Sequence, residues 1–497
     1  KWVAQLGGRA VATLPFLAAF LEEPIEISPY MPASRLYWNE FYVDPRKAPE
    51  FQDCAAAQSL ANSSQWQQEI EALQHSPLVD FPRLMALKRP VIEAMAQWFA
   101  ASRSGRHAAF EDYVRSHPLL SDYAAFRAVL RRRQAPWPAW PQPLRDGAVG
   151  ENDYAAEERS YHLYAQWLAE EQIASFANLG NGSNLYLDFP LGVHPHSYDV
   201  WRERDIFALG ASAGAPPDTL FTKGQYWSFP PLHPETIRDQ GYSYLIACLR
   251  HQLRHASWFR VDHVMGLHRL FWIPQGLEPK EGVYVQYRPE EMYAILSLES
   301  HRSKTVVVGE NLGTVPAAVN RAMERHGLHQ MYVLQYAAMP SPKRPLRPVP
   351  KNAVASLNTH DMPPFGGFFA GGDIEDMQKL GAFDEREARE QSSRPEASPI
   401  AGGLLSSQRK EADRCAFRQA GAKMPGMAGA QPGEDGADQP GGPVAGDRPA
   451  ECARDQYGAA QLETQGPLRA GRVHTDGRDL EGAAKGAPPS PFLCAGR

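Results

Sequence analysis

The sequence predicts an α/β fold built around a parallel sheet, because short apolar runs alternate along the chain with longer segments of helical periodicity. Most of these runs are apolar throughout, which is typical of parallel strands covered on both faces. Each run ends in polar residues, as a strand does where it meets a loop. We expect six strands, at residues 10–14, 184–190, 258–263, 305–310, 331–336 and 353–361.

A long segment between the first two expected strands, at about residues 50–180, is rich in Trp and Tyr. Within it, Tyr161, Tyr164, Trp167 and Leu168 recur at helical spacing. This pattern indicates an amphipathic helix that packs on a core. We therefore expect a mostly helical subdomain inserted into the sheet.

The charge balance argues against an anionic partner. Lys and Arg number 51 against 57 Asp and Glu, and the net charge is -6. Such a chain offers no basic field for nucleic acid or for an anionic membrane surface. Residues 10–21 form an apolar run, but Pro15 breaks it and Glu22 and Glu23 follow it, so it is too short to span a bilayer. A neutral or small polar substrate fits this composition better.

The cysteines predict a reducing, cytoplasmic environment. They show neither CxxC spacing nor a dense disulfide framework, which also argues against a structural zinc site. No signal peptide follows the first residue, Lys1, and we expect this end to be the cut edge of a longer chain. The five cysteines are Cys54, Cys248, Cys415, Cys452 and Cys494.

The composition changes after about Gln391. Residues 391–497 are rich in Gly, Ala and Pro, contain no Trp, and have only Phe417, Tyr457 and Phe492 as aromatics. Such a segment buries too little apolar surface to offset its ordering entropy. We therefore divide the chain into residues 1–390, with the fold, and a low-complexity tail that we expect to be disordered.

Three carboxylates end three of the apolar runs: Asp262, Glu310 and Asp361. An isolated Asp after a strand usually caps the next helix. Three such residues at separate strand ends instead indicate one site, because parallel strands end at a common face. Cleavage of a glycosidic bond with retention needs two carboxyl groups about 5–5.5 Å apart. Arg260, two residues before Asp262, would hold that carboxylate ionised and aligned, or form a plain structural ion pair.

Further residues could contact a sugar. His360 and Asp361 could reach sugar hydroxyls as the ring flattens toward an oxocarbenium ion. Tyr30, Tyr226 and Trp227 could stack on sugar rings, with Gln225 as a hydrogen-bonding neighbour. Taken singly, each aromatic residue is as often a core or loop anchor.

Several segments resemble one known family. They read FRVDHVMGLHRLFWIP at 259–274, VVVGENLGTVP at 306–316 and SLNTHDMPPF at 356–365, with SPY at 28–30 and GQYW at 224–227. These blocks, in this order, are similar to the amylomaltase or disproportionating-enzyme family, glycoside hydrolase family 77. The resemblance implies a (β/α)8 barrel with a helical insertion and 4-alpha-glucanotransferase activity.

By this resemblance Asp262 would be the nucleophile, Glu310 the general acid/base and Asp361 the transition-state stabiliser, with Arg260 and His360 in support. The reaction would pass a glucan from Asp262 to glucose or a maltooligosaccharide, with alpha-1,4-glucans as partners and no cofactor or metal. The rivals are an alpha-glucan hydrolase with the same triad and an inactive remnant that at most binds glucan. Matching positions imply sugar contacts by Tyr30, Asp188, Gln225, Trp227 and His263.

The chain departs from the family at both ends. The family's first strand precedes the segment matched here, and its eighth strand should fall where the chain has the Gly- and Pro-rich tail. Reading the tail one base later permits segments that resemble the family's eighth strand at 435–452 and its C-terminal elements at 453–465. We therefore expect a single-base insertion or deletion near the codons of Gln391, and a barrel that lacks strands one and eight.

Overall fold

The structure is a computed structural model that describes residues 2–22, 25–76, 78–102, 104–177, 184–218, 221–337, 347–364, 367–368 and 372–379. All of them belong to one compact unit, Lys1–Met427. The tail predicted at 391–497 lies outside the described residues.

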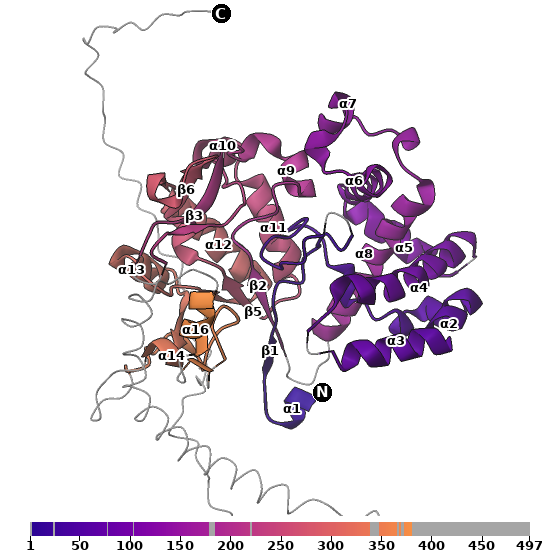
Figure 1. Cartoon of the computed structure of the whole chain (residues 1–497), viewed down its shortest axis with the longest axis horizontal. Coiled ribbons are helices and arrows are strands. Elements are labelled where there is room, and N and C mark those ends of the chain that lie inside the picture. Colours follow the sequence, from indigo (N-terminus) through magenta and orange to yellow (C-terminus); the bar gives the residue numbers. More distant parts are fainter. Residues whose placement is uncertain are drawn as a thin grey trace, which may run out of the picture. The chain divides into compact units, whose positions relative to one another are not determined.

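Six parallel strands form the central sheet, and they lie in it in the same order as in the chain. The prediction of an α/β fold with a parallel sheet is confirmed, and its six strands form a half-barrel. The strands Ala10–Ala12, Asn184–Phe189 and Trp258–Val261 can be followed in Figure 1. In sheet order the six strands are β1 (Ala10–Ala12), β2 (Asn184–Phe189), β5 (Trp258–Val261), β8 (Val306–Gly309), β9 (His329–Val333) and β10 (Ala353–Ser356).

The sheet is covered by the helices that connect its strands, which explains why the inner strands are mostly apolar, apart from the buried Asp188 and Arg260. In β5 and β8 the last three residues of each strand are buried. Helices α10 and α11 precede β5, α12 precedes β8 and α13 precedes β9. Their bounds are α10 (Pro234–Asp239), α11 (Ser243–Leu253), α12 (Pro289–Ser303) and α13 (Ala317–Arg325).

One predicted strand is partly wrong. The run at 331–336 was expected to be a strand throughout, but β9 ends at Val333 and α14 (Leu334–Ala337) follows at once. A short apolar run does not by itself distinguish a buried strand from a buried helical turn. The chain therefore turns away from the sheet three residues earlier than predicted.

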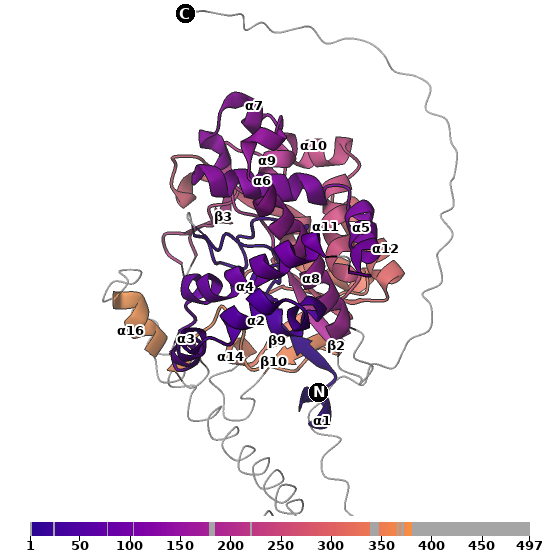
Figure 2. The same cartoon turned by 90° about the vertical axis from the view of Figure 1, so that its right-hand side faces the viewer.

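Helices fill the segment between β1 and β2. The central one is α8 (Ala156–Ala177), which is buried over most of its circumference because α4 and α6 pack on it and its own end contacts β2. Figure 2 faces this side of the sheet and shows these helices in front of the strands. The others are α2 (Ala55–Ala61), α3 (Ser64–Gln74), α4 (Phe81–Ala101), α5 (His107–Ser116), α6 (Leu120–Arg133) and α7 (Gln142–Arg145).

A second, antiparallel sheet was missed by the sequence analysis. The strand predicted at 258–263 is β5, but the 3-10 turn Val264–Leu267 follows it and leads into a separate strand that the sequence analysis did not predict. The partner strands have only two to five residues, which is too short for a clear periodic pattern. In sheet order they are β4 (Gln225–Tyr226), β3 (Ala211–Ala215), β6 (Arg269–Pro274) and β7 (Val283–Gln286).

A buried polar network ties the chain before the insertion to the sheet's helices. Asp199, on α9 (Tyr198–Arg202), accepts hydrogen bonds from the Ser34 hydroxyl at 2.5 Å, the Arg35 backbone N–H at 2.8 Å and the Tyr244 hydroxyl at 2.6 Å. The Arg35 guanidinium donates to the carbonyls of Pro190 and Leu191. Buried polar groups are stable only when they are paired in this way, so the network specifies how these segments meet.

We predict that Asp199→Ala lowers the free energy of unfolding by about 3–5 kcal/mol, because it leaves a buried arginine charge unbalanced and three donors without an acceptor. Urea unfolding followed by tryptophan fluorescence measures this. Asp146→Ala is the control, since its ion pair with Arg204 is at the surface and long at 3.4 Å, and we expect a change within about 0.5 kcal/mol. Equal, small effects for both variants would contradict the prediction.

Candidate active site

The structure places two of the predicted carboxylates at neighbouring strand ends. Asp262 directly follows β5 and Glu310 directly follows β8, and the preceding residues Val261 and Gly309 are paired in the parallel register. The Asp262 N–H donates to the Phe189 carbonyl at 3.0 Å, and the Glu310 N–H donates to the Val261 carbonyl at 2.9 Å. Because adjacent strands lie about 4.8 Å apart, the ladder itself sets the two carboxylates next to each other.

Arg260 bonds to two aspartates at once. Its Nη1 lies 2.8 and 3.0 Å from the two carboxylate oxygens of Asp188 and 2.9 Å from Oδ1 of Asp262. Asp188 and Arg260 are register partners on β2 and β5, so this contact is built into the sheet. Burial opposes the charge of Arg260, but the charges of Asp188 and Asp262 outweigh it and raise the Arg260 pKa. The guanidinium is therefore a fixed positive charge beside Asp262.

Tyr30 is a second hydrogen-bond donor to Asp188. Its hydroxyl donates to Oδ2 of Asp188 at 2.5 Å. Burial raises the pKa of Asp188, an effect that the Arg260 charge opposes. With Arg260 and Tyr30 both bonded to it, and 4% of its surface exposed, Asp188 is a structural part of the site.

Glu310 is held in a different environment. Its Oε2 accepts from the His263 backbone N–H at 3.0 Å and its Oε1 accepts from the Leu312 N–H at 2.6 Å. Burial, and then the negative charge of Asp262, raise the Glu310 pKa to about 7, although the two amides and Arg260 oppose this. A carboxyl group with such a pKa can both give and take a proton near neutral pH.

His263 lies between the two carboxylates and turns the chain there. Its backbone is left-handed, with φ at 46°, and its N–H donates to Glu310. Burial lowers the pKa of its imidazole to about 4, so the ring is neutral at physiological pH. The edge of this ring meets Trp227 at 5.1 Å between ring centroids, and the Trp227 indole N–H donates to Gln225 Oε1 at 3.1 Å. Gln225 and Trp227 therefore form one border of the site.

Asp361 was expected at the end of the strand predicted at 353–361, but it does not lie at a strand end. Strand β10 ends at Ser356, and Asp361 lies five residues further on, with its side chain 66% exposed. His360 Nε2 is 3.0 Å from Asp361 Oδ1, and the His360 ring stacks on Tyr30 at 4.8 Å between centroids. Burial would raise the Asp361 pKa, but the hydrogen bond and charge of His360, and the charge of Arg260, lower it below its usual value.

Asn311 and Leu312, which follow Glu310, also shape the site, and the sequence analysis missed both. Leu312 contributes only a backbone N–H, for which no sequence signal exists. Asn311 has an amide side chain directly after the carboxylate, which could have been noticed. Its Oδ1 accepts from the Met331 N–H at 3.0 Å and its Nδ2 donates to Asn320 at 2.9 Å, which ties the turn to β9.

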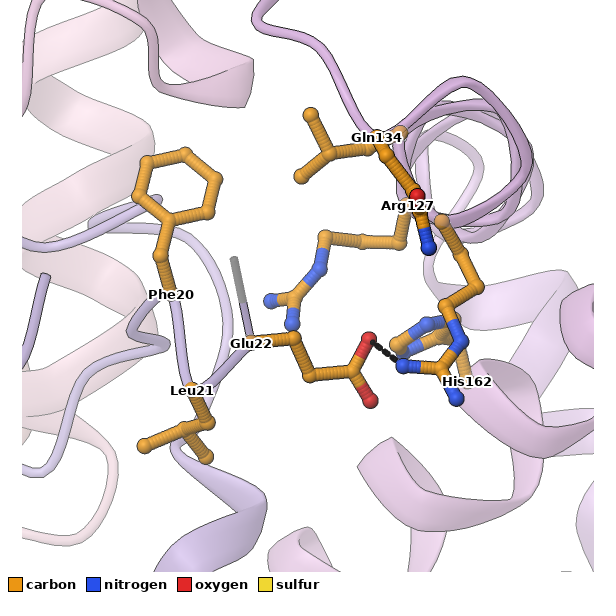
Figure 3. Close-up of a pocket in the computed structure, with 8 residues that line it drawn as sticks. Phe20, Leu21, Glu22, Arg127, Gln134 and His162 are labelled. Atoms are coloured by element: carbon orange, nitrogen blue, oxygen red, sulfur yellow. Dashed lines mark ion pairs between the residues drawn. The ribbon is translucent and has the colours of Figure 1, made fainter. Parts of the chain in front are cut away.

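A separate cavity of about 160 Å³ is lined by none of the three predicted carboxylates. Glu22 forms an ion pair with Arg131 at 2.6 Å. Figure 3 shows Glu22, Arg127 and His162 around this cavity. Arg127 also bonds to Tyr123, and His162 to Glu158. These polar groups pair with one another, so this cavity is a polar seam between the chain at 20–22 and helices α6 and α8.

The described ranges contain neither a candidate metal site nor a candidate membrane span. No group of three or more His, Cys, Asp or Glu residues in these ranges is arranged to hold a metal ion. No helix in the same part of the chain is long and apolar enough to cross a membrane.

The chain matches the family model described as 4-alpha-glucanotransferase over residues 1–421. It is 34% identical over 390 residues to the 4-alpha-glucanotransferase of Mycobacterium tuberculosis (strain ATCC 25618 / H37Rv), covering 74% of this chain and 52% of the relative. For the enzyme of Haemophilus influenzae the identity is 31% over 405 residues, covering 77% and 58%. The chain thus spans about half the length of these relatives.

Two solved structures resemble the fold. Amylomaltase from Corynebacterium glutamicum matches with a TM-score of 0.70 and 29% identity, covering 82% of this chain and 57% of that one. Amylomaltase from Streptococcus agalactiae, solved in complex with acarbose, matches with a TM-score of 0.64 and 18% identity, covering 74% and 75%. The second likeness concerns the fold alone.

We predict that the Glu310 carboxyl titrates with a pKa of about 7, far above the ordinary glutamate value of about 4.3. Carbon-13 NMR of glutamate-labelled protein measures this, with Glu310→Gln identifying the signal. Asp262→Asn should move the titration to lower pH, because it removes a negative charge that raises the Glu310 pKa. Asp205→Asn, at an exposed position, should leave it unchanged. An ordinary pKa in the unsubstituted protein would refute the assignment.

Proposed function

The chain belongs to the 4-alpha-glucanotransferase family, glycoside hydrolase family 77, and we propose that it acts as a retaining transferase of alpha-1,4-glucan segments. Acceptors would be glucose or maltooligosaccharides. The observation that carries this proposal is the pair Asp262 and Glu310, set at register-paired strand ends in contrasting environments. Arg260 keeps a positive charge beside Asp262, while burial raises the pKa of Glu310 to about 7.

The proposed reaction has two displacements. In the first, Asp262 attacks the anomeric carbon while Glu310 gives its proton to the departing glycosidic oxygen, which leaves a glucosyl ester on Asp262. In the second, Glu310 takes the proton of an acceptor's 4-hydroxyl, and that oxygen displaces Asp262 from the anomeric carbon. The Glu310 pKa of about 7 supports both roles, because the group must alternate between acid and base.

The other predicted residues would act around this pair. Asp361, with His360 beside it, would bind sugar hydroxyls as the ring approaches the oxocarbenium-like transition state. Trp227 and Gln225 would contact sugars from the β4 border, where the neutral His263 ring adjoins them. Tyr30 bonds to Asp188, and Asp188 bonds to Arg260, so that both would help to hold Arg260 in place. They would also contact the sugar.

We also propose that the half-barrel is part of a (β/α)8 barrel. The six described strands follow chain order across the sheet, as strands two to seven of such a barrel would. Closure takes one further strand beside β1 and one beside β10, because an open sheet leaves two unpaired edges. A cytoplasmic location remains part of the proposal, and the described cysteines Cys54 and Cys248, both free and buried, are consistent with it.

The products made from maltotriose test the reaction. We predict longer oligosaccharides together with glucose, because an acceptor sugar intercepts the ester on Asp262. Asp262→Asn should lower kcat by at least about 10³-fold, since no nucleophile remains, whereas Glu235→Gln, at a surface ion pair with Arg288, should not. Chromatography of the labelled products measures both. Shorter products alone would favour the hydrolase, and glucan binding without turnover would favour the inactive remnant.

The altered reading frame of the tail has a direct test. We predict that sequencing the gene from the codon of Glu385 to that of Leu468 will reveal a gained or lost base. The family match ends at residue 421, and this stretch covers both that point and Gln391. Translation in the restored frame should then supply an eighth strand. The maltotriose assay can also be applied to the chain translated in this frame. An unbroken frame would refute the frame change.

A further inference from the structure

The three carboxylates differ in how the fold places them. Asp262 and Glu310 each follow the last paired residue of a strand, so ladder hydrogen bonds set their backbones. Asp361 follows β10 by five residues, within a loop at 357–363. Inside this loop, the Asp361 N–H donates to Thr359 Oγ1 at a long 3.3 Å. The position of Asp361 therefore depends on what holds the loop from outside.

Gln335 contacts both ends of this loop from the neighbouring element α14. Its backbone N–H donates to the Leu357 carbonyl at 3.3 Å, and its side-chain Nε2 donates to the Pro363 carbonyl at 3.1 Å. Gln335 is 3% exposed, so that water does not compete for these bonds. One buried residue thus links the two points between which His360 and Asp361 project.

The far side of the same loop rests on Tyr30. The His360 ring stacks on the Tyr30 ring with an interplanar angle of 5°, and Tyr30 is itself bonded to Asp188. Tyr30 constrains His360 by a ring contact, which leaves sliding within the plane free. The hydrogen bond to Pro363 has a direction and therefore restricts that movement.

Packing alone does not require a glutamine at this position. The Oε1 of Gln335 is buried and has no hydrogen-bond partner among the described residues. An unsatisfied buried acceptor is unfavourable, and an apolar side chain of similar size would avoid it. The feature that only the amide supplies is the bond from Nε2 to Pro363.

We propose that Gln335 is a positioning residue for Asp361, an inference that rests on the proposed function. By holding the loop at 357–363 at both ends, it keeps Asp361 and His360 where the sugar ring must meet them. A displacement of a catalytic group by about 1 Å can lower a rate on the order of 100-fold.

The first experiment measures the loop and does not depend on turnover. Gln335→Met keeps the length of the side chain and removes its N–H donors. We expect hydrogen exchange on the millisecond-to-second scale, followed by mass spectrometry, to become at least about tenfold faster at residues 358–362. Gln335→Leu serves as a second variant should the first not fold.

The control is another buried glutamine. Gln166, on α8, is 1% exposed, and its side chain bonds to the backbone of Trp38 at 2.8 and 2.7 Å. Gln166→Met should lower stability without altering exchange at residues 358–362. Unchanged exchange of the loop in Gln335→Met would overturn the proposal whatever the activity.

The second experiment is a double-mutant cycle on the transfer rate, with a maltosyl fluoride donor so that slow variants stay measurable. Gln335→Met alone should lower kcat about 10- to 100-fold and leave KM within about threefold. In the Asp361→Asn background it should have no further effect, because its target is already gone. An equal loss in both backgrounds would overturn the proposal. A wild-type chain without transfer would count against the proposed function, and the exchange comparison would still decide the role of Gln335.

Discussion

The buried guanidinium of Arg260 is the interaction on which the rest of the site depends. Its single positive charge forms ion pairs with both Asp188 and Asp262, and a buried carboxylate without such a partner would be strongly destabilising. Asp188 in turn anchors Tyr30, and Tyr30 carries the ring that supports His360. Removing the guanidinium would therefore disturb Asp262 and, through this series of contacts, the loop that bears Asp361.

The two carboxylates at neighbouring strand ends acquire different chemistry from small differences in their surroundings. Asp262 faces a permanent positive charge at 2.9 Å. Glu310 is held by two backbone amides, but burial and the nearby charge of Asp262 dominate and raise its pKa to about 7. The negative charge of Asp262 thus contributes to the raised pKa of Glu310, and two carboxyl groups in such different environments suit the separate roles that we propose for them.

The apolar runs of the sequence located all six strands of the parallel sheet, and the polar residues that end them pointed to Asp262 and Glu310. The limits of the strands were less predictable. Val333 ends β9 although the apolar run continues, since a short run fits a strand and a buried helical turn equally well. The antiparallel sheet was not predicted, because Gly214 and its neighbours resemble a loop until cross-strand pairing is known.

By itself the sequence determined which side chains could perform the chemistry, because strand periodicity and the order of the motifs are local properties of the chain. Only the tertiary structure decided how they act. The pairing of Val261 with Gly309, the backbone amides on Glu310 and the two bonds of Gln335 all join residues that are distant in sequence or belong to the main chain. Neither burial nor backbone direction is written in residue type, so the Glu310 pKa and the placement of Asp361 follow from packing.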